Sequence, residues 1–371
     1  MAEIQGNYDE LFAPVADAFA ATLDEGDTGG SVAVFIGGEP VVDLWGGHAD
    51  AARTRPWQRD TLTNCWSVTK TMTALCALVL MDRGELDPAA PVARYWPEFA
   101  AAGKDGVLVR HLLSHTAGLP DWEWPVEELF DWEAATARLA ARAPRWEPGT
   151  RAGYHSLTQG FLVGEVVRRI TGRTLGRLFA DELAGPLGAD FHIGLPAAHD
   201  PRVALAVPPP GRDEEYTAGA ASDTAEESGT ATALRVRDGN STAWRRAEIP
   251  AASGYGNARS VALLQSLTAC GGEVGGVRLL SRAGSDRARE VQYEGEDVVL
   301  GMPARYAMGY GMFGDRSYGW GGWGGSLVAV DVDARMAVAY VTSQMREPAA
   351  DARGMDLIGA AYEGLKRAAA G

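Results

Sequence analysis

The sequence predicts an α+β fold, in which an antiparallel sheet flanked by N- and C-terminal helices carries an inserted, mostly helical domain. Strand-like runs gather near both ends of the chain, helical periodicity fills the middle, and an amphipathic helix borders each end. We therefore expect an α/β sheet domain formed by residues 1–85 and 290–371. Residues 86–289 would form the mostly helical domain, with the functional site at the interface of the two.

The N-terminal segment predicts a helix followed by a hairpin. Apolar residues recur at helical spacing over residues 8–23 and indicate one amphipathic helix. Residues 31–36 and 40–45 are β-rich, and Gly37-Gly38-Glu39 between them is a hairpin signal. These runs would supply the first strands of the sheet.

The C-terminal segment predicts the same elements in reverse order. Residues 326–332 and 336–342 form an apolar hairpin pattern, and residues 351–369 follow as a last helix. Between the two ends the signals are mostly helical, with connections rich in proline and glycine. Residues 207–248 are rich in small, polar and acidic residues, which predicts a long loop that borders the site.

Composition excludes several classes of partner. The 371-residue chain carries a net charge of −15 and has no basic stripe, which argues against nucleic acid and anionic membranes. Its longest apolar run, residues 72–81, is too short to cross a bilayer. The polar start lacks the pattern of a secretory signal, so we expect a cytoplasmic protein. The sequence does not indicate an oligomeric state.

The cysteines predict neither disulfides nor metal binding. Cys65, Cys76 and Cys270 are odd in number and lack the paired spacing of a zinc site. We therefore expect buried, reduced thiols. We expect no metal and no other cofactor.

A serine and a lysine one helical turn apart give the clearest chemical signal. Lys70 is one of only three lysines among 34 basic residues, and it follows Ser67 by three positions. That spacing places both side chains on one helix face, and lysine, unlike arginine, can accept a proton when it is buried. The pair thus predicts an activated nucleophile, on a helix from Ser67 to Arg83. The alternative interpretation is a serine cap followed by a solvated lysine.

Two further clusters accompany this pair. Tyr154 lies in Gly-Tyr-His-Ser just before an amphipathic helix, where a tyrosine serves either packing or chemistry. Residues 318–326 (YGWGGWGGS) lead into a β-run near the C-terminus. Their glycines predict either a bend in the strand or a backbone against which substrate can lie.

The order of the three clusters resembles that of the serine β-lactamase and penicillin-binding-protein superfamily, to which a Ser-x-x-Lys motif belongs. The sequence is most similar to family VIII carboxylesterases and class C-type β-lactamases. Residues 109–120 (VRHLLSHTAGLP), 153–160 (GYHSLTQG) and 256–260 (GNARS) carry the resemblance further. It extends over roughly residues 25–345 and implies a β-lactamase/transpeptidase-like fold.

The resemblance implies a role for each matched residue. Ser67 would be the acylated nucleophile, Lys70 its proton acceptor, and Tyr154 the phenol that passes a proton to the leaving group. The backbone N–H groups of Ser67 and Trp323 would form the oxyanion hole. The expected substrate contacts are Trp320, Gly321, Gly322, His155 and Ser156. His111 and His115 would support packing near the site. The aromatic-rich region itself predicts core packing or loop anchoring, with a wall of the substrate site as the alternative; it contains Trp122, Trp124, Trp132 and Trp146.

Two departures from the family pattern bear on the substrate. Ser156 stands where many β-lactamases carry asparagine, and Trp320 stands where lysine or histidine is common. The second change removes a cation from the place where the carboxylate of a β-lactam would bind. We therefore expect a serine esterase for small neutral carboxylic esters. Hydrolysis of a β-lactam, amide or D-peptide, and acyl transfer by the same groups, remain the alternatives, as does a non-catalytic binding protein of the same fold.

Overall fold

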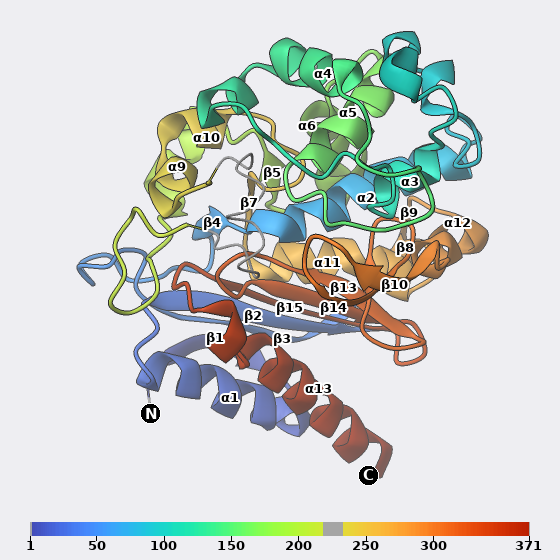
Figure 1. Ribbon diagram of the computed structural model, residues 1–371. Coiled ribbons are helices and arrows are strands. Elements are labelled where there is room, and N and C mark those ends of the chain that lie inside the picture. Colours follow the sequence, from blue (N-terminus) through green and yellow to red (C-terminus); the bar gives the residue numbers. More distant parts are fainter. Residues whose placement is uncertain (1, 218–232, 371) are drawn as a thin grey trace.

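The computed structural model describes residues 2–217 and 233–370, and its main feature is one antiparallel sheet (Figure 1). Within the described residues the strand order is β1-β3-β2-β15-β14-β13-β12-β11-β10. The strands are β1 (Ile4–Tyr8), β2 (Gly29–Ile36), β3 (Glu39–Gly47), β10 (Tyr293–Asp297), β11 (Met302–Tyr306), β12 (Gly311–Met312), β13 (Ser317–Gly321), β14 (Leu327–Asp331) and β15 (Met336–Thr342).

The two ends of the chain meet in the middle of this sheet. Strand β2 pairs with β15 from Ile36↔Met336 to Gly30↔Thr342. Alternate residues of β2 enter opposite cores: Val32 and Val34 face one, and Ala33 and Phe35 face the other. The strand is therefore buried on both faces, which explains its nearly continuous apolar sequence.

Helices cover both faces of the sheet. Helices α1 (Ala13–Asp24) and α13 (Arg353–Ala370) pack side by side beneath it, and α11 (Ala258–Ala269) lies on the opposite face against β2, β14 and β15 (Figure 1). Small residues of β15 on that face, Ala337 and Ala339, let α11 approach closely. The predicted α+β fold with terminal helices is confirmed. The predicted domain boundaries stay a prediction, although α11, within residues 86–289, contacts the sheet.

The remaining elements lie beyond α11 on the upper side of the sheet (Figure 1). The helices are α2 (Thr69–Asp82), α3 (Val109–Leu113), α4 (Trp132–Ala141), α5 (Thr158–Thr171), α6 (Leu175–Phe179), α7 (Gly185–Leu187), α9 (Val236–Asn240), α10 (Thr242–Arg246) and α12 (Arg282–Asp286). A small sheet has the order β5-β7-β4-β6, with β5 (His192–Ile193), β7 (Gly254–Gly256), β4 (Leu62–Asn64) and β6 (Val203–Ala204). Strands β8 (Glu273–Val274) and β9 (Val277–Arg278) form a separate hairpin.

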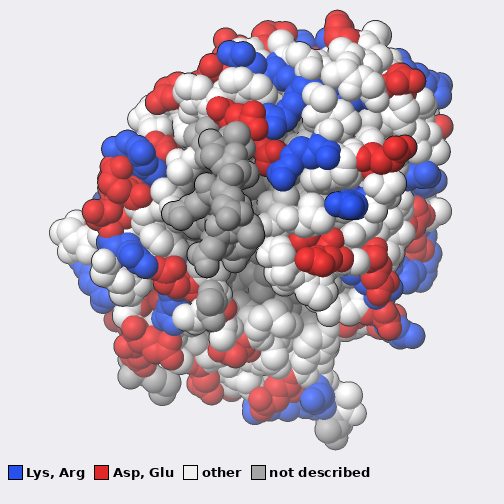
Figure 2. Space-filling model, viewed as in Figure 1, with Lys and Arg blue, Asp and Glu red and all other residues white. Residues whose placement is uncertain are grey.

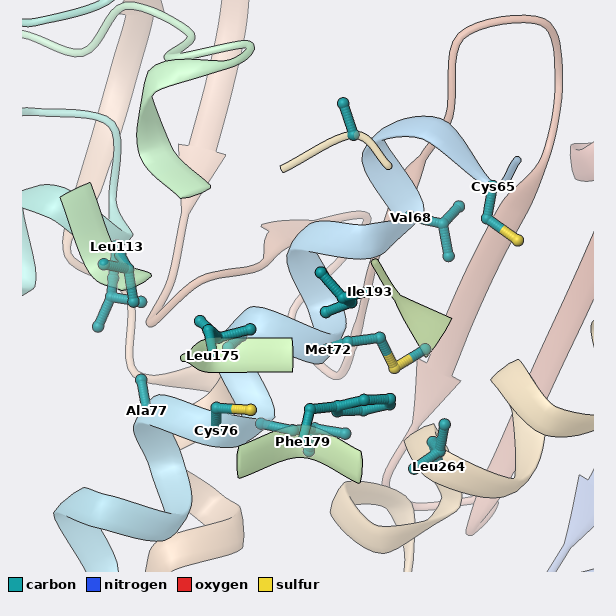
Figure 3. Close-up of a cluster of buried hydrophobic side chains, with 14 of the residues drawn as sticks. Cys65, Val68, Met72, Cys76, Ala77, Leu113, Leu175, Phe179, Ile193 and Leu264 are labelled. Atoms are coloured by element: carbon teal, nitrogen blue, oxygen red, sulfur yellow. The ribbon is translucent and has the colours of Figure 1, made fainter. Parts of the chain in front are cut away.

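Helix α2 is the centre of the upper core. All its residues except Asp82 are buried, and a helix that is apolar on every side belongs in an interior. Figure 3 shows side chains of α2 among those of neighbouring helices and strands, with Met72, Cys76, Leu175, Phe179, Ile193 and Leu264 labelled. Truncating such a side chain, as in Leu75→Ala, costs about 2–5 kcal/mol. The core thus fixes the helix that begins just after Ser67.

Three local predictions differ from the structure. Residues 8–23 contain the end of β1 and a short 3-10 turn before α1, because Pro14 suits only the first turn of an α-helix. The predicted helix from Ser67 to Arg83 is α2, preceded by a 3-10 turn, Trp66–Val68, that contains Ser67. In the predicted loop 207–248, the structure forms α9 and α10; residues 218–232 lie outside the described part of the chain.

The surface carries acidic and basic side chains interspersed with one another (Figure 2). Many of the arginines pair with carboxylates, for example Arg138 with Glu128 and Arg202 with Asp190. An exposed pair of this kind contributes about 0–1 kcal/mol, and the Arg202–Asp190 pair is partly buried. Within the described residues, no helix is both long enough and apolar enough to cross a membrane.

Candidate active site

Ser67 lies in the tight turn between β4 and α2. Trp66, the residue before it, has a φ of +47°, a left-handed conformation that costs a bulky residue about 1–3 kcal/mol. The Asn64 side chain accepts a hydrogen bond from the Trp66 N–H at 3.2 Å, and the Cys65 N–H donates to the Gly254 carbonyl at 2.8 Å. These contacts hold the strained turn and leave the Ser67 side chain partly exposed.

Lys70 is fully buried directly beneath Ser67. Its ammonium donates to Ser67 Oγ at 3.2 Å, to the Ser156 carbonyl at 2.6 Å and to the Ala251 carbonyl at 3.0 Å. Burial lowers the pKa of Lys70 from its usual 10.5, and the neighbouring Tyr154 partly opposes that shift. When the amine is neutral, two N–H bonds can stay on the carbonyls and the lone pair can face Ser67 Oγ.

Tyr154 meets the same hydroxyl from the other side. It precedes α5, and its phenol donates to Ser67 Oγ at 2.7 Å. The Lys70 ammonium lies 4.9 Å from the centre of the Tyr154 ring. The structure therefore brings together the three side chains that the sequence singled out, although 87 residues separate Ser67 from Tyr154. A hydroxyl, an amine and a phenol in this arrangement can move a proton between them.

Trp320 joins this group from strand β13. Its indole N–H donates to the Tyr154 phenol oxygen at 3.4 Å, and its ring stacks on Tyr306 with centres 5.8 Å apart and planes at 21°. Trp320 is 8% exposed, so it presents a nearly dry aromatic wall where the family pattern has a cation. This wall favours neutral ligand groups over carboxylates.

Asp297 supports the candidate site through hydrogen bonds that the sequence interpretation missed. Its fully buried carboxylate accepts N–H groups from Tyr154, Val299 and Leu300 through Oδ1, and the Tyr306 hydroxyl at 2.7 Å through Oδ2. It thus fixes both the backbone of Tyr154 and the ring on which Trp320 stacks. A lone aspartate 143 residues from Tyr154 gives no sequence signal of this contact.

The histidines near Tyr154 form hydrogen bonds with backbone groups around the site. His155 is fully buried; its Nε2 accepts the Leu119 N–H at 3.0 Å, so Nδ1 carries the hydrogen and donates to the Gly153 carbonyl at 2.6 Å. His115 Nδ1 accepts the His155 N–H at 3.1 Å. Both ring nitrogens are occupied by backbone groups and the ring is buried, so the structure does not support the expected substrate contact of His155, which stays a prediction. His111 Nδ1 likewise accepts the Leu108 N–H.

Ser156 contributes its backbone more than its side chain. Its carbonyl holds Lys70, whereas the residue itself is exposed beside the site. A hydroxyl here is shorter than the asparagine amide of the family pattern. Its contact with substrate stays a prediction.

The predicted oxyanion donors lie on adjoining backbone segments. Strand β13 ends at Gly321, and a Cβ placed on Gly322 would lie 2.5 Å from the Cys65 carbonyl oxygen. Only glycine allows so close an approach. The Trp323 and Trp66 rings meet edge to face at 4.8 Å. Within the described residues, neither the Ser67 N–H nor the Trp323 N–H donates a hydrogen bond to the chain.

Gly321 differs from Gly322. It is exposed, and a Cβ there would meet only Leu327 Cδ1 at 3.7 Å. The close backbone contact that requires glycine at position 322 is therefore absent at Gly321. A bare, exposed backbone at the end of β13 is consistent with the prediction that substrate lies against it.

An aromatic cluster borders the two backbone segments that carry the Ser67 and Trp323 N–H groups. Trp66 packs against Trp244 at 5.8 Å, and Tyr216 stacks on Trp323 at 5.9 Å with planes at 22°. The Tyr216 hydroxyl donates to Glu347 at 2.7 Å, which holds the ring in place. This side of the site is thus apolar as well.

The four tryptophans of residues 122–146 have structural contacts. Trp122 stacks on Phe161, Trp132 donates to Glu165 at 2.8 Å, and the ring of Trp146 covers Gly153. Trp124 packs edge to face on Trp122. These contacts agree with core packing and loop anchoring. Within the described residues, no group of three or more histidine, cysteine, aspartate or glutamate side chains is placed to bind a metal.

Comparison with known proteins identifies the family. The β-lactamase family model matches residues 15–363, so the chain belongs to the β-lactamase family. It is a serine hydrolase of the β-lactamase superfamily, related to family VIII carboxylesterases. The resemblance seen in the sequence is confirmed.

Three relatives are similar over nearly the whole chain. The esterase/β-lactamase LipL of Mycobacterium tuberculosis is 36% identical, over 92% of this chain and 83% of LipL. A solved family VIII carboxylesterase is 42% identical, with a TM-score of 0.89 over 98% of this chain and 100% of that one. A penicillin-binding protein homologue from Caulobacter crescentus is 36% identical, with a TM-score of 0.88 over 98% and 100%.

Proposed function

We propose that this protein is a carboxylesterase that cleaves small neutral esters through an acyl-enzyme on Ser67. The observation that carries the proposal is that Ser67 Oγ lies 3.2 Å from Lys70 Nζ and 2.7 Å from the Tyr154 hydroxyl. A buried amine and a phenol on one hydroxyl are suited to removing its proton and to protonating a leaving group.

Acylation begins with the neutral amine of Lys70. It takes the proton of Ser67 while Oγ bonds to the ester carbonyl carbon. The carbonyl oxygen gains the negative charge and accepts hydrogen bonds from the N–H groups of Ser67 and Trp323. When the carbon–oxygen bond to the alcohol breaks, Tyr154 donates its proton to the departing oxygen. Lys70 then returns its extra proton to Tyr154, so both groups regain their starting states.

Deacylation uses the same groups in reverse. The Tyr154 and Lys70 pair takes a proton from water as the water oxygen bonds to the acyl carbon. Collapse of the tetrahedral intermediate releases the carboxylic acid, and Ser67 Oγ receives the proton as it leaves. If an alcohol replaces water at this step, the product is a new ester, and the reaction is acyl transfer.

The character of the walls supports neutral esters. Trp320 places an aromatic ring and a weak N–H donor beside Tyr154, where a lysine would attract a carboxylate. The cluster of Trp66, Trp323 and Tyr216 makes the opposite side apolar. An anionic β-lactam would lose water at both walls without gaining a cation.

A second candidate function, β-lactam hydrolysis, has one supporting observation. LipL, similar over most of the chain, is named both an esterase and a β-lactamase. The same nucleophile and the same oxyanion donors would act on a lactam carbonyl. The two functions therefore differ in the binding of the substrate carboxylate and not in the chemistry.

A burst experiment tests the proposal. Rapid mixing with p-nitrophenyl acetate and p-nitrophenyl butyrate should release p-nitrophenol, and mass spectrometry of the trapped protein should find the acyl group on the peptide that contains Ser67. Nitrocefin should be turned over at least about 100-fold less efficiently. The Ser67→Ala variant should be neither acylated nor labelled by a fluorophosphonate probe; labelling of that variant would overturn the assignment of the nucleophile.

A further inference from the structure

We propose that Arg353, at the start of α13, is a positioning residue for the oxyanion hole. It would act by holding the turn Gly322–Gly325, which carries the Trp323 N–H. The inference rests on the proposed function and adds a residue that lies outside the sequence motifs of the site.

The turn is closed by two backbone hydrogen bonds. The Gly325 N–H donates to the Gly322 carbonyl at 3.1 Å, and the Gly322 N–H donates to the Ser326 carbonyl at 2.6 Å. In a trans peptide the C=O and the N–H point in opposite directions. Because the Gly322 carbonyl points inward to Gly325, the N–H of the same peptide, that of Trp323, points outward. Gly324 has a φ of +94°, which suits the third position of such a turn.

The guanidinium of Arg353 donates hydrogen bonds to this turn and to neighbouring acceptors. Nη2 donates to the Gly324 carbonyl at 2.8 Å and to Asp351 at 2.7 Å, and Nε donates to Asp351 at 2.8 Å. Nη1 donates to Asp27 at 2.7 Å and to the Gln344 carbonyl at 3.0 Å. All five N–H groups therefore have acceptors, and the side chain is 3% exposed.

The guanidinium also touches the turn directly. A Cβ placed on Gly325 would lie 2.3 Å from Arg353 Nη2 and 2.3 Å from Asp351 Oδ2. The backbone of the turn thus rests on the Arg353–Asp351 ion pair with no room for a side chain between them. A shift of the guanidinium must move the turn, and with it the direction of the Trp323 N–H.

Arg346 gives an internal control for this idea. It donates to Asp27 Oδ1 at 2.8 Å and to Glu25 at 3.1 Å, so it belongs to the same ionic network as Arg353. Within the described part of the chain, its hydrogen bonds reach these carboxylates and not the turn. If the network served only to tie α13 to the N-terminal part of the chain, the two arginines would matter in the same way.

The decisive experiment compares Arg353→Met with Arg346→Met in the full-length protein. For each, kcat and KM are measured with p-nitrophenyl butyrate, the inhibition constant with phenylboronic acid, and the thermal midpoint by circular dichroism. The boronate forms a tetrahedral adduct with the serine and places one oxygen in the oxyanion hole. Removing a single oxyanion donor costs about 10²–10³ in kcat, so misplacing one should cost about 10- to 100-fold.

For Arg353→Met we expect that loss in kcat, a KM within about three-fold of wild type, and boronate inhibition weakened by a similar factor to kcat. For Arg346→Met we expect kcat and boronate inhibition within about two-fold of wild type, even where the thermal midpoint falls. Equal losses in the two variants would overturn the proposal in favour of a purely structural network. A folded Arg353→Met variant with unchanged kcat would overturn it as well.

Two further variants keep the test decisive if Arg353→Met does not fold. Arg353→Lys keeps a positive charge near Asp27 and Asp351 but loses the fork that reaches Gly324, and it should show the same pattern more weakly. Gly325→Ala pushes a methyl group against the guanidinium and should lower kcat as well; normal kcat in both would contradict the proposal. Fluorophosphonate labelling of the wild-type protein at Ser67 separates a failure of the proposed function from a failure of the proposed role of Arg353. Absence of labelling would contradict the proposed function itself.

Discussion

Trp320 donates its indole N–H to the phenol oxygen of Tyr154 at 3.4 Å, from a ring that contacts both Tyr306 and His115. The phenol therefore has a neutral donor on one side and Ser67 Oγ on the other. A neutral N–H stabilises a developing phenolate less than an ammonium would, but it leaves the site without a cation that attracts carboxylates. Under the proposed function, the same residue would affect both proton transfer and the choice of substrate.

The first prediction concerns that N–H. Trp320→Phe keeps an aromatic ring against Tyr306 and removes the donor, so kcat for p-nitrophenyl butyrate should fall about three- to ten-fold with little change in KM. Stopped-flow and steady-state kinetics check this. Met302→Phe, at an exposed position on β11, serves as a control for the introduction of phenylalanine and should leave kcat unchanged. A Trp320→Phe variant with wild-type kcat would show that the hydrogen bond has no role.

The second prediction uses two buried lysines as a matched pair. Lys104 is fully buried like Lys70, but its ammonium donates to three carbonyls, those of Ala101, Ala140 and Arg142, and to no hydroxyl of the described residues. Lys70→Arg keeps the charge but cannot accept a proton, so turnover should fall about 10³-fold or more. Lys104→Arg should leave the turnover of the folded protein within about two-fold. Comparable losses in both variants would attribute the effect to packing and not to proton transfer.

The third prediction is the pH dependence of acylation. Only neutral Lys70 can take the proton of Ser67, so the burst rate should rise with pH and level off above the pKa of Lys70. Burial lowers that pKa from 10.5, so the midpoint of the rise should lie below pH 10.5. Rapid-mixing measurements of the burst between pH 5 and pH 10 check it, with the free hydrolysis of the ester subtracted. A burst rate that falls as pH rises would reverse the assignment of the base.

The fourth prediction separates the charge of Asp297 from its hydrogen bonds. Asp297→Asn keeps an oxygen for the N–H groups of Tyr154, Val299 and Leu300, and its amide can donate to a rotated Tyr306 hydroxyl. We expect kcat within about three-fold of wild type. Asp297→Ala leaves those buried groups without an acceptor and should cost about 2–4 kcal/mol in unfolding free energy and at least about ten-fold in kcat. Urea unfolding and steady-state kinetics distinguish the two variants.

The side chains of the candidate site could be predicted because their types and spacing are chemically unusual. A rare lysine three residues after a serine, a tyrosine before a helix and a glycine-rich strand are local patterns, and the structure brings all three together. The hairpins at both chain ends could also be predicted from local patterns, because buried strands such as β2 and β15 have long apolar runs.

The supporting residues could not be predicted in this way. Asp297 acts on a backbone N–H 143 residues away, and Arg353 acts on a carbonyl 29 residues away, so neither forms a local pattern. Strand β1 was missed because an edge strand with mostly exposed residues shows no apolar alternation. His155 was assigned to substrate from its place beside Tyr154, but its ring lies in the interior, where backbone groups of Leu119 and Gly153 bond to its two nitrogens.

The last prediction follows from that burial. Burial lowers the pKa of His155 from 6.5 to about 4, so between these values the unfolded chain binds a proton that the folded protein does not. The free energy of unfolding should therefore fall as the pH drops from 6.5 to 4, by about 3 kcal/mol from this group alone. His115 and His111, whose pKa values burial also lowers, add to the loss with the same sign. Urea unfolding at several pH values should give a shallower slope for His155→Gln, which can still accept from Leu119 and donate to Gly153. An unchanged slope in this variant would mean that His155 is already charged in the folded protein, and its Nε2 would then be unable to accept the Leu119 N–H.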